Sequence, residues 1–349
     1  MSEGSILVTG GAGFVGSHYV QRAVLDSRSV VTLDALTYAG DLANLNDVQT
    51  AENHVFVEGS IADGALLSQL LAEYRPTAII NFAAESHVDR SIDRPESFVE
   101  SNILGVYTLL ETVRQYCGSI DGFRFLHIST DEVYGSLEVG TAVEQDRYDP
   151  SSPYAASKAA ADHLVRAWHR TYGIPTLITN CTNNYGPRQF PEKLIPLILA
   201  KALKEEDLPL YGDGMQERDW LHVSDHCNAL DAVLARGKPG ETYNIAAGET
   251  HRNRDVVEQI CTILDRKRPR EGGLSYQALI KCVPDRPGHD RRYALDASKI
   301  KRVLGWKAET TFSDGLAETM DWYLENQQWN ESAGRRYNGA RMGTAGKVG

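Results

Sequence analysis

The chain has 349 residues, of which 42% are hydrophobic, and a formal net charge of −11 at pH 7. This composition fits a globular protein with one large domain and a smaller one, and an acidic chain without a basic run argues against a nucleic-acid partner. No apolar run reaches the roughly 18–20 residues of a membrane helix, and the N-terminus has no signal-peptide pattern, so we expect a cytoplasmic protein outside the membrane.

The first thirty-four residues predict a strand, a tight turn, a helix and a second strand. Apolar residues run from Ile6 to Thr9, a glycine cluster follows, and residues 14–25 have the apolar spacing of a helix. The glycines fit either Gly11-x-Gly13-x-x-Gly16, the usual dinucleotide fingerprint, or Gly10-x-x-Gly13-x-x-Gly16. In both readings a pyrophosphate can approach bare backbone at a helix N-terminus.

The second strand, Val30 to Leu33, ends in Asp34. An acidic residue at this place accepts hydrogen bonds from the adenosine ribose and repels a 2′-phosphate. The unit as a whole therefore predicts a dinucleotide site that prefers NAD over NADP.

Strands and helices continue to alternate along the chain. Further strands are expected at residues 55–57, 78–82, 123–128 and 176–179, and helices at 95–116 and 154–172. This alternation predicts an α/β fold with a doubly wound parallel sheet, the Rossmann architecture. We expect the NAD-binding domain at residues 1–185 with a return segment near 223–247, and a smaller α+β domain mainly at 186–330. Residues 331–349 lack apolar periodicity and are expected to form a mobile tail.

Two groups of residues near the middle of the chain suggest proton chemistry. Tyr154 and Lys158 lie four apart in a predicted helix and therefore share a face, and an ammonium beside a phenol lowers the pKa of the phenol. Tyr154 could then act as a base near neutral pH. Thr130, Asp131 and Glu132 follow an apolar strand, and although most Asp-Glu pairs are solvent-facing turns, this position favours a catalytic pair. The five cysteines lack Cys-x-x-Cys spacing, so neither disulfides nor a metal site is expected.

The motifs resemble those of the extended short-chain dehydrogenase/reductase superfamily, in Thr9 to Gly16, Asp34 and Tyr154-x-x-x-Lys158. Within it, the chain closely resembles the dTDP-glucose 4,6-dehydratase family. This closer likeness rests on five longer motifs, at residues 83–91, 129–135, 183–187, 191–196 and 285–290, and extends from about Ser5 to Trp329.

The resemblance implies a lyase with catalytic NAD that converts dTDP-glucose to dTDP-4-keto-6-deoxyglucose and water, as in deoxysugar biosynthesis. Tyr154, with Lys158 and Thr130, would remove the 4-hydroxyl proton while hydride passes from C4 to NAD. Glu132 would take the C5 proton, protonated Asp131 would protonate the departing 6-hydroxyl, and hydride would return to C6. The two carboxyl groups would need pKa values that burial and mutual repulsion push apart.

The resemblance also implies two sets of binding residues. Those for the cofactor are Gly10, Gly13, Phe14, Val15, Gly16, Asp34, Leu36, Thr37, Ser60, Ile61, Ala83, Ala84, Ser86, Ser101, Ser129, Tyr154 and Lys158. Those for the nucleotide-sugar substrate are Ser86, His87, Thr130, Asn183, Asn184, Lys193, Leu194, Pro209, Tyr211, Arg218, Asn253, Arg286 and His289. A homodimer joined by a four-helix bundle of residues 95–116 and 154–172 is implied as well.

The chain departs from the family pattern at three places. Ser60 stands where Asp usually faces the adenine, Arg188 replaces a common Tyr, and Glu217 puts an acid next to Arg218. These departures leave open another nucleotide hexose, such as UDP-glucose, as the substrate.

Two further functions share part of this residue pattern. Sugar-nucleotide 4-epimerases share the cofactor and the Tyr-Lys chemistry, but need neither a C5 base nor an acid for the 6-hydroxyl, so the presence of both Asp131 and Glu132 favours elimination. A non-catalytic NAD-sensing module would be expected to lack Tyr154, Lys158 or one of the acids, and all are present.

Overall fold

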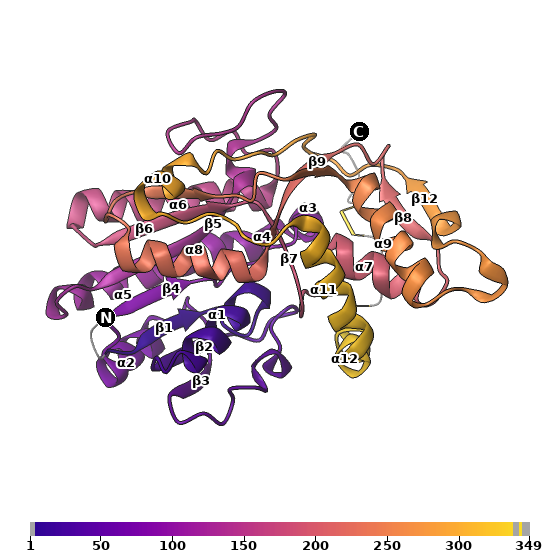
Figure 1. The fold of residues 1–349 in the computed structure, drawn as a ribbon. Coiled ribbons are helices and arrows are strands. Elements are labelled where there is room, and N and C mark those ends of the chain that lie inside the picture. The colour runs from indigo at the N-terminus through magenta and orange to yellow at the C-terminus, as the bar shows by residue number, and fades with distance from the viewer. Residues whose placement is uncertain (1–3, 338–341, 344–349) are drawn as a thin grey trace.

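The computed structural model describes residues 4–337, 342 and 343. Its largest element is a seven-stranded sheet with the strand order β10-β6-β5-β4-β1-β2-β3, in which every neighbouring pair is parallel (Figure 1). The predicted doubly wound parallel sheet is therefore confirmed.

The strands of this sheet are β1 (Ile6–Thr9), β2 (Val30–Asp34), β3 (His54–Glu58), β4 (Ala78–Asn81), β5 (Arg124–Thr130), β6 (Thr176–Cys181) and β10 (Thr242–Ile245). The helices that flank it are α1 (Phe14–Leu25), α2 (Gly64–Tyr74), α3 (Val88–Asp93), α4 (Pro95–Phe98), α5 (Val106–Tyr116), α6 (Pro153–Tyr172), α8 (Val223–Arg236) and α10 (Ser298–Leu304). Short 3-10 helices lie at residues 42–45, 117–119 and 131–134.

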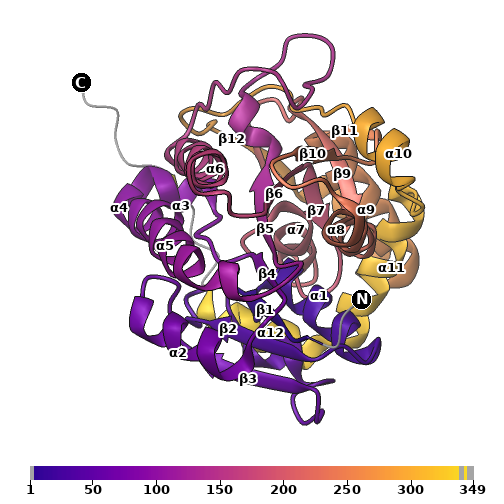
Figure 2. The same ribbon diagram turned by 90° about the vertical axis from the view of Figure 1, so that its left-hand side faces the viewer.

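Helices cover both faces of the sheet, as its continuous apolar strands require. On one face, Val20 of α1 and Val233 of α8 belong to one hydrophobic core with the strands. On the other face, Leu67 of α2, Leu110 of α5 and Val165 of α6 belong to a second core. Figure 2 shows these two layers on opposite sides of the strands. The rigid sheet therefore places the ends of its strands in fixed positions.

The chain leaves the sheet after β6 and later returns to it. β10 pairs in parallel with β6, from Thr242 opposite Ile178 to Ile245 opposite Cys181. α8, which precedes β10, packs against α1. Both elements lie in the segment where the sequence predicts a return, although the limits of the two domains stay a prediction.

A second, smaller core lies outside the sheet. It contains Tyr185, Ile198, Val257 and Leu316, all buried. Its elements are β7 (Asn183–Tyr185), α7 (Leu194–Ala202), β8 (Leu208–Tyr211), β9 (Glu217–His222), β11 (Thr250–Arg252), α9 (Asn253–Lys267), β12 (Ile280–Val283), α11 (Phe312–Glu325) and α12 (Gln327–Arg336), with 3-10 turns at residues 271–273 and 276–279. They form a three-stranded sheet, β11-β9-β7, and a two-stranded sheet, β12-β8.

Two expectations about helices need correction. The stretch 95–116 is not one α-helix, because a seven-residue π-helix, Val99–Gly105, separates α4 from α5. The expected mobile tail begins too early, because α12 continues to Arg336 and buries Ala333 completely. Residues 338–341 and 344–349 of that tail lie outside the described residues. No helix in the described part of the chain is long and apolar enough to cross a bilayer.

Candidate active site

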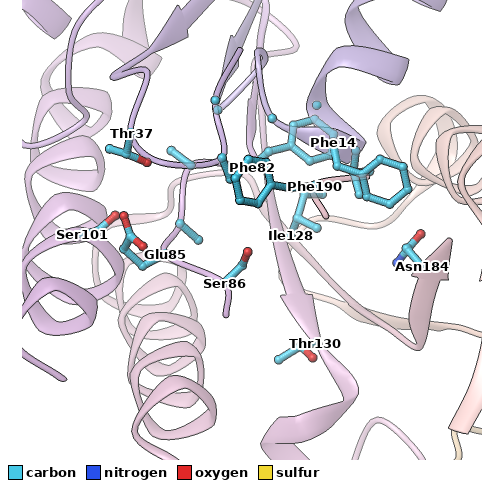
Figure 3. Close-up of a pocket in the computed structure, with 18 of the residues that line it drawn as sticks. Phe14, Thr37, Phe82, Glu85, Ser86, Ser101, Ile128, Thr130, Asn184 and Phe190 are labelled. Carbon is cyan, nitrogen blue, oxygen red and sulfur yellow. The ribbon is translucent and has the colours of Figure 1, made fainter. Parts of the chain in front are cut away.

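A cavity of about 320 Å³ lies outside the carboxyl ends of the central strands. Gly10 follows β1 and Phe82 follows β4, and both line it. The strand order reverses between β1 and β4, and open parallel sheets bind ligands at such a switch point. Figure 3 shows Phe14 and Phe82 on one side of this cavity and Thr130 on another.

The glycine turn at the end of β1 fits a close-lying diphosphate. Gly10 has a φ of +70°, and a Cβ there would lie 2.6 Å from the Ala83 nitrogen, while a Cβ at Gly16 would lie 2.2 Å from the Gly10 oxygen. Gly13 is the N-cap residue of α1 and has no side chain that could bind the first backbone N–H groups of the helix. These N–H groups are therefore available to an anion in the cavity. Gly10, Gly13 and Gly16 line the cavity and Gly11 does not, which favours the second reading of the glycine pattern.

Asp34 ends β2 at the rim of the same cavity, with 8% of the residue exposed. Its Oδ2 accepts a hydrogen bond from the Ala12 nitrogen and its Oδ1 one from the Leu36 nitrogen, both at 2.8 Å. These bonds fix the carboxylate at the place where a ribose is expected. Leu36 does not line the cavity, so its contribution is the backbone N–H that holds Asp34.

The other cofactor residues implied by the sequence all line the cavity. On the wall that Figure 3 shows at the left, Thr37, Glu85 and Ser101 lie together. The Ser129 hydroxyl, however, donates to Asp162 at 2.9 Å and is used inside the protein. The residues present therefore fit a dinucleotide stretched from Asp34 to Tyr154.

The residues with expected proton chemistry come together at the inner end of the cavity. Asp131 and Glu132 begin a 3-10 turn directly after β5, and the Thr130 hydroxyl, which caps this turn, accepts from the Glu132 nitrogen at 3.3 Å. Tyr154 lies in the first turn of α6, which the Ser152 hydroxyl caps. Thr130 lies close enough to Tyr154 to act on its pKa, which it lowers.

The two adjacent carboxyl groups differ in their surroundings. Burial, with the neighbouring Glu132 charge, raises the pKa of Asp131 well above its ordinary value. Its Oδ1 accepts from the Thr130 hydroxyl at 3.2 Å, and its Oδ2 has no hydrogen-bond partner among the described residues. Burial also raises the pKa of Glu132, but the positive charges of Arg286 and Arg218 oppose this. Asp131 is therefore the group that keeps a proton more readily, and Glu132 the one that ionises more readily.

The Tyr154 and Lys158 pair differs from the sequence expectation. The Lys158 amine donates to the Ile128 carbonyl oxygen at 2.7 Å, and burial lowers its pKa to about 8. Burial and the Glu132 charge raise the pKa of Tyr154 well above its ordinary value, so the net shift is opposite to the lowering that the sequence predicts. The positive nicotinamide ring of NAD would add a charge that favours the phenolate.

The substrate residues implied by the sequence fall into two groups. Ser86, Thr130, Asn183, Asn184 and Lys193 line the cavity, and Figure 3 shows Asn184 on the wall opposite Glu85. The residues that do not line it are His87, Leu194, Pro209, Tyr211, Arg218, Asn253, Arg286 and His289. The implied substrate site therefore extends beyond the cavity.

Part of this second group surrounds Glu132 from the side of the smaller core. The Arg218 guanidinium lies 4.3 Å from the centre of the Tyr293 ring, and the Tyr293 hydroxyl is 3.4 Å from Glu132 Oε2. Arg286 pairs with Asp89 at 2.6 Å. Arg218 also donates to backbone carbonyl groups of residues 217 and 290, which leaves it less free for a diphosphate than the sequence suggests.

Comparisons with known proteins agree with this geometry. The family model described as GDP-mannose 4,6 dehydratase matches residues 7–319. The dTDP-glucose 4,6-dehydratase of Xanthomonas campestris pv. campestris (strain B100) is 58% identical over 93% of this chain and 94% of its own length, and dTDP-glucose 4,6-dehydratase 1 of Escherichia coli (strain K12) is 52% identical over 93% and 94%. The crystal structure of DesIV, a dTDP-glucose 4,6-dehydratase from Streptomyces venezuelae with NAD bound, superposes with a TM-score of 0.88 at 45% identity and covers 94% of this chain and 99% of its own. The chain belongs to the dTDP-glucose 4,6-dehydratase family.

Three residues of this family member escaped the sequence interpretation. The Arg90 guanidinium lies 3.8 Å from the centre of the Tyr38 ring, and Arg90 Nε donates to Glu192 Oε2 at 2.8 Å. Tyr38 and Glu192 line the cavity, and Glu192 Oε1 is buried without a hydrogen-bond partner among the described residues. Glu192 lies inside the motif 191–196 and could have been selected from it, whereas no pattern marks Tyr38.

The three departures from the family pattern have simple structural accounts. The Ser60 hydroxyl accepts from the Ala62 nitrogen at 3.1 Å and stabilises a turn at the cavity wall. Arg188 pairs with Asp47 at 2.8 Å, outside the cavity. The Glu217 charge lies within 4 Å of two arginines, Arg252 at 3.7 Å and Arg292 at 3.4 Å, and so does not face Arg218 unbalanced. Across the described residues, no cluster of three His, Cys, Asp or Glu side chains could hold a metal ion.

Proposed function

We propose that the chain is an NAD-dependent dTDP-glucose 4,6-dehydratase, which converts dTDP-glucose to dTDP-4-keto-6-deoxyglucose and water. The observation that carries this proposal is the pair of buried Asp131 and half-buried Glu132 at the inner end of a dinucleotide-shaped cavity beside Tyr154. A 4-epimerase needs no such pair. The relatives that are more than half identical to this chain carry the name of this activity.

The bound NAD would accept a hydride from C4 of the sugar and give it back at C6, so that no net oxidation occurs. Tyr154, beside Thr130, removes the proton of the 4-hydroxyl in this proposal. The 4-ketone makes the hydrogen on C5 acidic, and Glu132 takes this proton. Asp131 supplies a proton to the 6-hydroxyl as its C–O bond breaks, and water leaves. When the hydride has returned to C6, Glu132 gives a proton back to C5, which is the position where one hydrogen from solvent enters the product.

The different surroundings of the two acids support these opposite roles. Burial and the Glu132 charge raise the pKa of Asp131 well above normal and outweigh the opposing charge of Arg218, which favours the neutral acid. Glu132 faces Arg286 and Arg218, which favour the carboxylate form that a base needs.

The substrate diphosphate would be bound by cations near Glu132. The Lys193 amine reaches the cavity and donates to the Ser86 carbonyl oxygen at 2.9 Å. The Arg286 Nε group is buried without a hydrogen-bond partner among the described residues, so it has a donor left for a ligand. Asn184 and Asn253 stay predicted contacts.

We also propose a homodimer, built as the sequence suggests from residues 95–116 and α6. Large apolar side chains are exposed there, with Leu104 53%, Tyr107 47% and Tyr172 51% exposed. The Tyr107 and Trp168 rings are 5.9 Å apart, edge to face, and Trp168 in turn meets Tyr172 at 5.6 Å. An aromatic and aliphatic patch over two neighbouring helices suits a second copy of the same patch. A cytoplasmic location stays a prediction of the sequence.

One experiment tests three things together: the reaction, the preference for the nucleotide base of the substrate, and the return of the cofactor to its oxidised form. The purified protein is incubated with dTDP-glucose in deuterated water and the product is weighed by mass spectrometry, with UDP-glucose in a parallel tube. Loss of one water with gain of one solvent deuterium, and no net change in reduced cofactor, is expected from dTDP-glucose. Faster conversion of UDP-glucose would favour the second substrate, and unchanged or epimerised dTDP-glucose would contradict the roles given to Asp131 and Glu132.

A further inference from the structure

A buried carboxyl group, Asp162, lies one helical turn beyond Lys158 in α6. Residues four apart share a helix face, and both are buried, with 4% of Lys158 and 0% of Asp162 exposed. Asp162 does not line the cavity and has no part in the chemistry described above. A buried carboxyl that only filled space would be costly, so its partners are informative.

Two hydroxyl groups converge on one oxygen of Asp162. Its Oδ2 accepts from the Ser129 hydroxyl at 2.9 Å and from the Tyr148 hydroxyl at 2.8 Å. The Tyr148 oxygen itself accepts from Arg166 at 2.6 Å and from the Asn180 amide at 3.3 Å, so its own proton is directed to Asp162. Burial raises the pKa of Asp162, while the charges of Lys158 and Arg166 and these two hydrogen bonds oppose that rise and favour the carboxylate.

The second oxygen of Asp162 faces His127. A separate chain of hydrogen bonds keeps this histidine neutral. The Thr9 hydroxyl donates to Asn81 Oδ1 at 2.6 Å, and the Asn81 amide is 3.0 Å from His127 Nδ1. Since the amide nitrogen only donates, His127 Nδ1 accepts and Nε2 carries the hydrogen. That Nε2 lies 3.6 Å from Asp162 Oδ1, and burial lowers the pKa of His127 well below its ordinary value. His127 therefore gives Asp162 no compensating charge.

The Lys158 amine has few other groups to keep it charged. Its hydrogen bond to the Ile128 oxygen is neutral, and the charges that raise its pKa are those of Asp162 first and Cys181 second. Burial raises the pKa of the Cys181 thiol to about 12, so it carries no charge at neutral pH. The titratable and charged groups that face Lys158, Asp162 or Tyr154 are Tyr154 and Arg166 from α6, His127 from β5, Asp131 and Glu132 from the 3-10 turn, Cys181 from β6 and Tyr148 from the loop before α6.

We infer that Asp162 is a positioning residue that keeps Lys158 protonated and thereby sets the upper pH limit of the reaction proposed for Tyr154. This inference rests on the function proposed above. Without the Asp162 charge, burial acts on Lys158 unopposed and the amine loses its proton at a lower pH. A neutral Lys158 no longer stabilises the Tyr154 phenolate, so activity would be lost from the alkaline side.

The test uses Asp162→Asn, which keeps the size of the side chain and an oxygen that can accept from Ser129 and Tyr148. Two quantities are measured between pH 6 and 10 on the purified holoenzyme: the pH profile of kcat/KM with dTDP-glucose, and the rate at which Lys158 is acylated, read by peptide mass spectrometry against the exposed Lys301. In the variant, both the alkaline limb and the acylation midpoint of Lys158 are expected to fall by about one pH unit or more.

The matched control is Asp225→Asn. Asp225 is similarly buried, at 2% exposed, accepts from the backbone nitrogens of residues 309 and 310, and does not line the cavity. This variant is expected to lose stability and to keep both pH midpoints.

The outcomes separate the possible failures. An Asp162→Asn protein that loses activity equally at every pH, with the Lys158 acylation midpoint unchanged, would overturn the inference, because the loss would then be structural. If the variant does not fold, the acylation midpoint of Lys158 in the wild-type protein still tests the inference. A midpoint below about 6.5, the ordinary pKa of a histidine, would mean that Lys158 is uncharged at neutral pH. Asp162 would then not keep Lys158 protonated. A protein without dehydratase activity whose Lys158 midpoint still depends on Asp162 would contradict the proposed function and leave the electrostatic coupling standing.

Discussion

Asp131 and Glu132 are adjacent in the chain and yet meet different neighbours. The 3-10 turn that starts at Asp131 turns one carboxyl group toward Thr130 and the other toward the arginines of the smaller core. Because a carboxyl group takes its pKa from its surroundings, one short turn can present an acid and a base to the same sugar.

We expect Asp131→Asn to slow the loss of water more than the oxidation at C4. The amide cannot give a proton to the departing hydroxyl, while Tyr154 and Lys158 are unchanged. The overall rate should fall by about 10²–10⁴-fold, and absorbance at 340 nm should show reduced cofactor accumulating on the enzyme. Glu132→Gln serves as the companion variant, because it should abolish deuterium uptake at C5; equal slowing of both steps in Asp131→Asn would count against its role as the acid.

The buried amine of Lys158 also affects the stability of the folded chain. Its pKa of about 8 in the folded chain lies below the ordinary 10.5, so at pH 7 folding places a charged amine in a site that disfavours the charge, at a cost of about 3 kcal/mol. Between pH 8 and 10.5 the unfolded chain binds more protons than the folded chain, so the stability of the wild-type protein rises with pH.

Lys158→Met should therefore unfold at a higher urea concentration than the nucleotide-free wild-type protein at pH 7. Its free energy of unfolding should be higher by about 1–3 kcal/mol, because part of the gain is offset by loss of the hydrogen bond to Ile128. The variant should be inactive. This advantage should be complete below pH 8 and shrink steadily toward pH 10.5. A difference that stays constant from pH 7 to pH 10 would show that the pKa of Lys158 is not the cause.

At the scale of elements, the π-helix Val99–Gly105 turns Asn102 inward. Asn102 Oδ1 accepts from the Glu85 nitrogen at 2.9 Å, and its amide donates to the Glu85 oxygen at 3.0 Å and to the Ser157 hydroxyl at 2.9 Å. It thereby ties the loop after β4, which lines the cavity, to α6.

We expect Asn102→Leu to lower the free energy of unfolding by about 2–4 kcal/mol, since it leaves the backbone groups of Glu85 without partners. The Michaelis constant for dTDP-glucose should rise as well, because the loop loses its support. Urea unfolding and steady-state kinetics measure both. Glu100→Ala, an exposed change in the same π-helix, should alter neither.

The last helix, α12, connects to the glycine turn through one side chain. Trp329 Nε1 donates to Asn44 Oδ1 at 2.9 Å, and the Asn44 amide donates to the Ala12 oxygen at 2.9 Å. Trp329→Phe removes one hydrogen bond and keeps the ring, so we expect NAD to bind about fivefold more weakly with little change in kcat, as measured by calorimetry.

Trp306→Phe is the control for this change. Trp306 is buried, and its Nε1 has no hydrogen-bond partner in the described part of the chain, so replacing it should leave NAD affinity unchanged. Equal affinities of the two variants would mean that α12 does not support the glycine turn.

The sequence predicted the elements of the sheet better than their connections. α1 begins and ends where its apolar spacing indicates, and β2 ends at Asp34 as expected. No local pattern predicts the π-helix, and the contact that its Asn102 makes is with Glu85, seventeen residues away. α12 escaped for a similar reason, since Trp329 has its partner at Asn44.

The site shows the same division between local and distant contacts. The glycine turn and the Thr130 to Glu132 turn are local, and the sequence indicates both. The group of Tyr38, Arg90 and Glu192 comes from three separate segments, and only the fold brings them together. For Arg218 the sequence suggests a free cation for the diphosphate. In the structure its guanidinium already donates hydrogen bonds to backbone carbonyl groups, which a sequence does not reveal.

At the scale of the whole molecule, the proposed dimer has a direct test. Leu104→Glu combined with Tyr107→Glu places two charges in the exposed apolar patch and should give a monomer by light scattering, whereas the wild-type protein should be a dimer. Val139→Glu, at a side chain that is 85% exposed in a loop elsewhere, should leave the dimer intact. A monomeric wild-type protein would contradict the proposal.

The late arrival of β10 affects how the chain can fold during its synthesis. β6 ends at Cys181 and its outer neighbour β10 ends at Ile245. A ribosome that adds about 5–20 residues per second needs roughly 3–13 s to make the segment between them. Throughout that interval the growing sheet presents an unpaired strand edge, a surface on which nascent chains can associate wrongly. The time at which translation reaches Ile245, rather than the completion of the nucleotide-binding motifs, is therefore the point from which the edge of β6 can be covered.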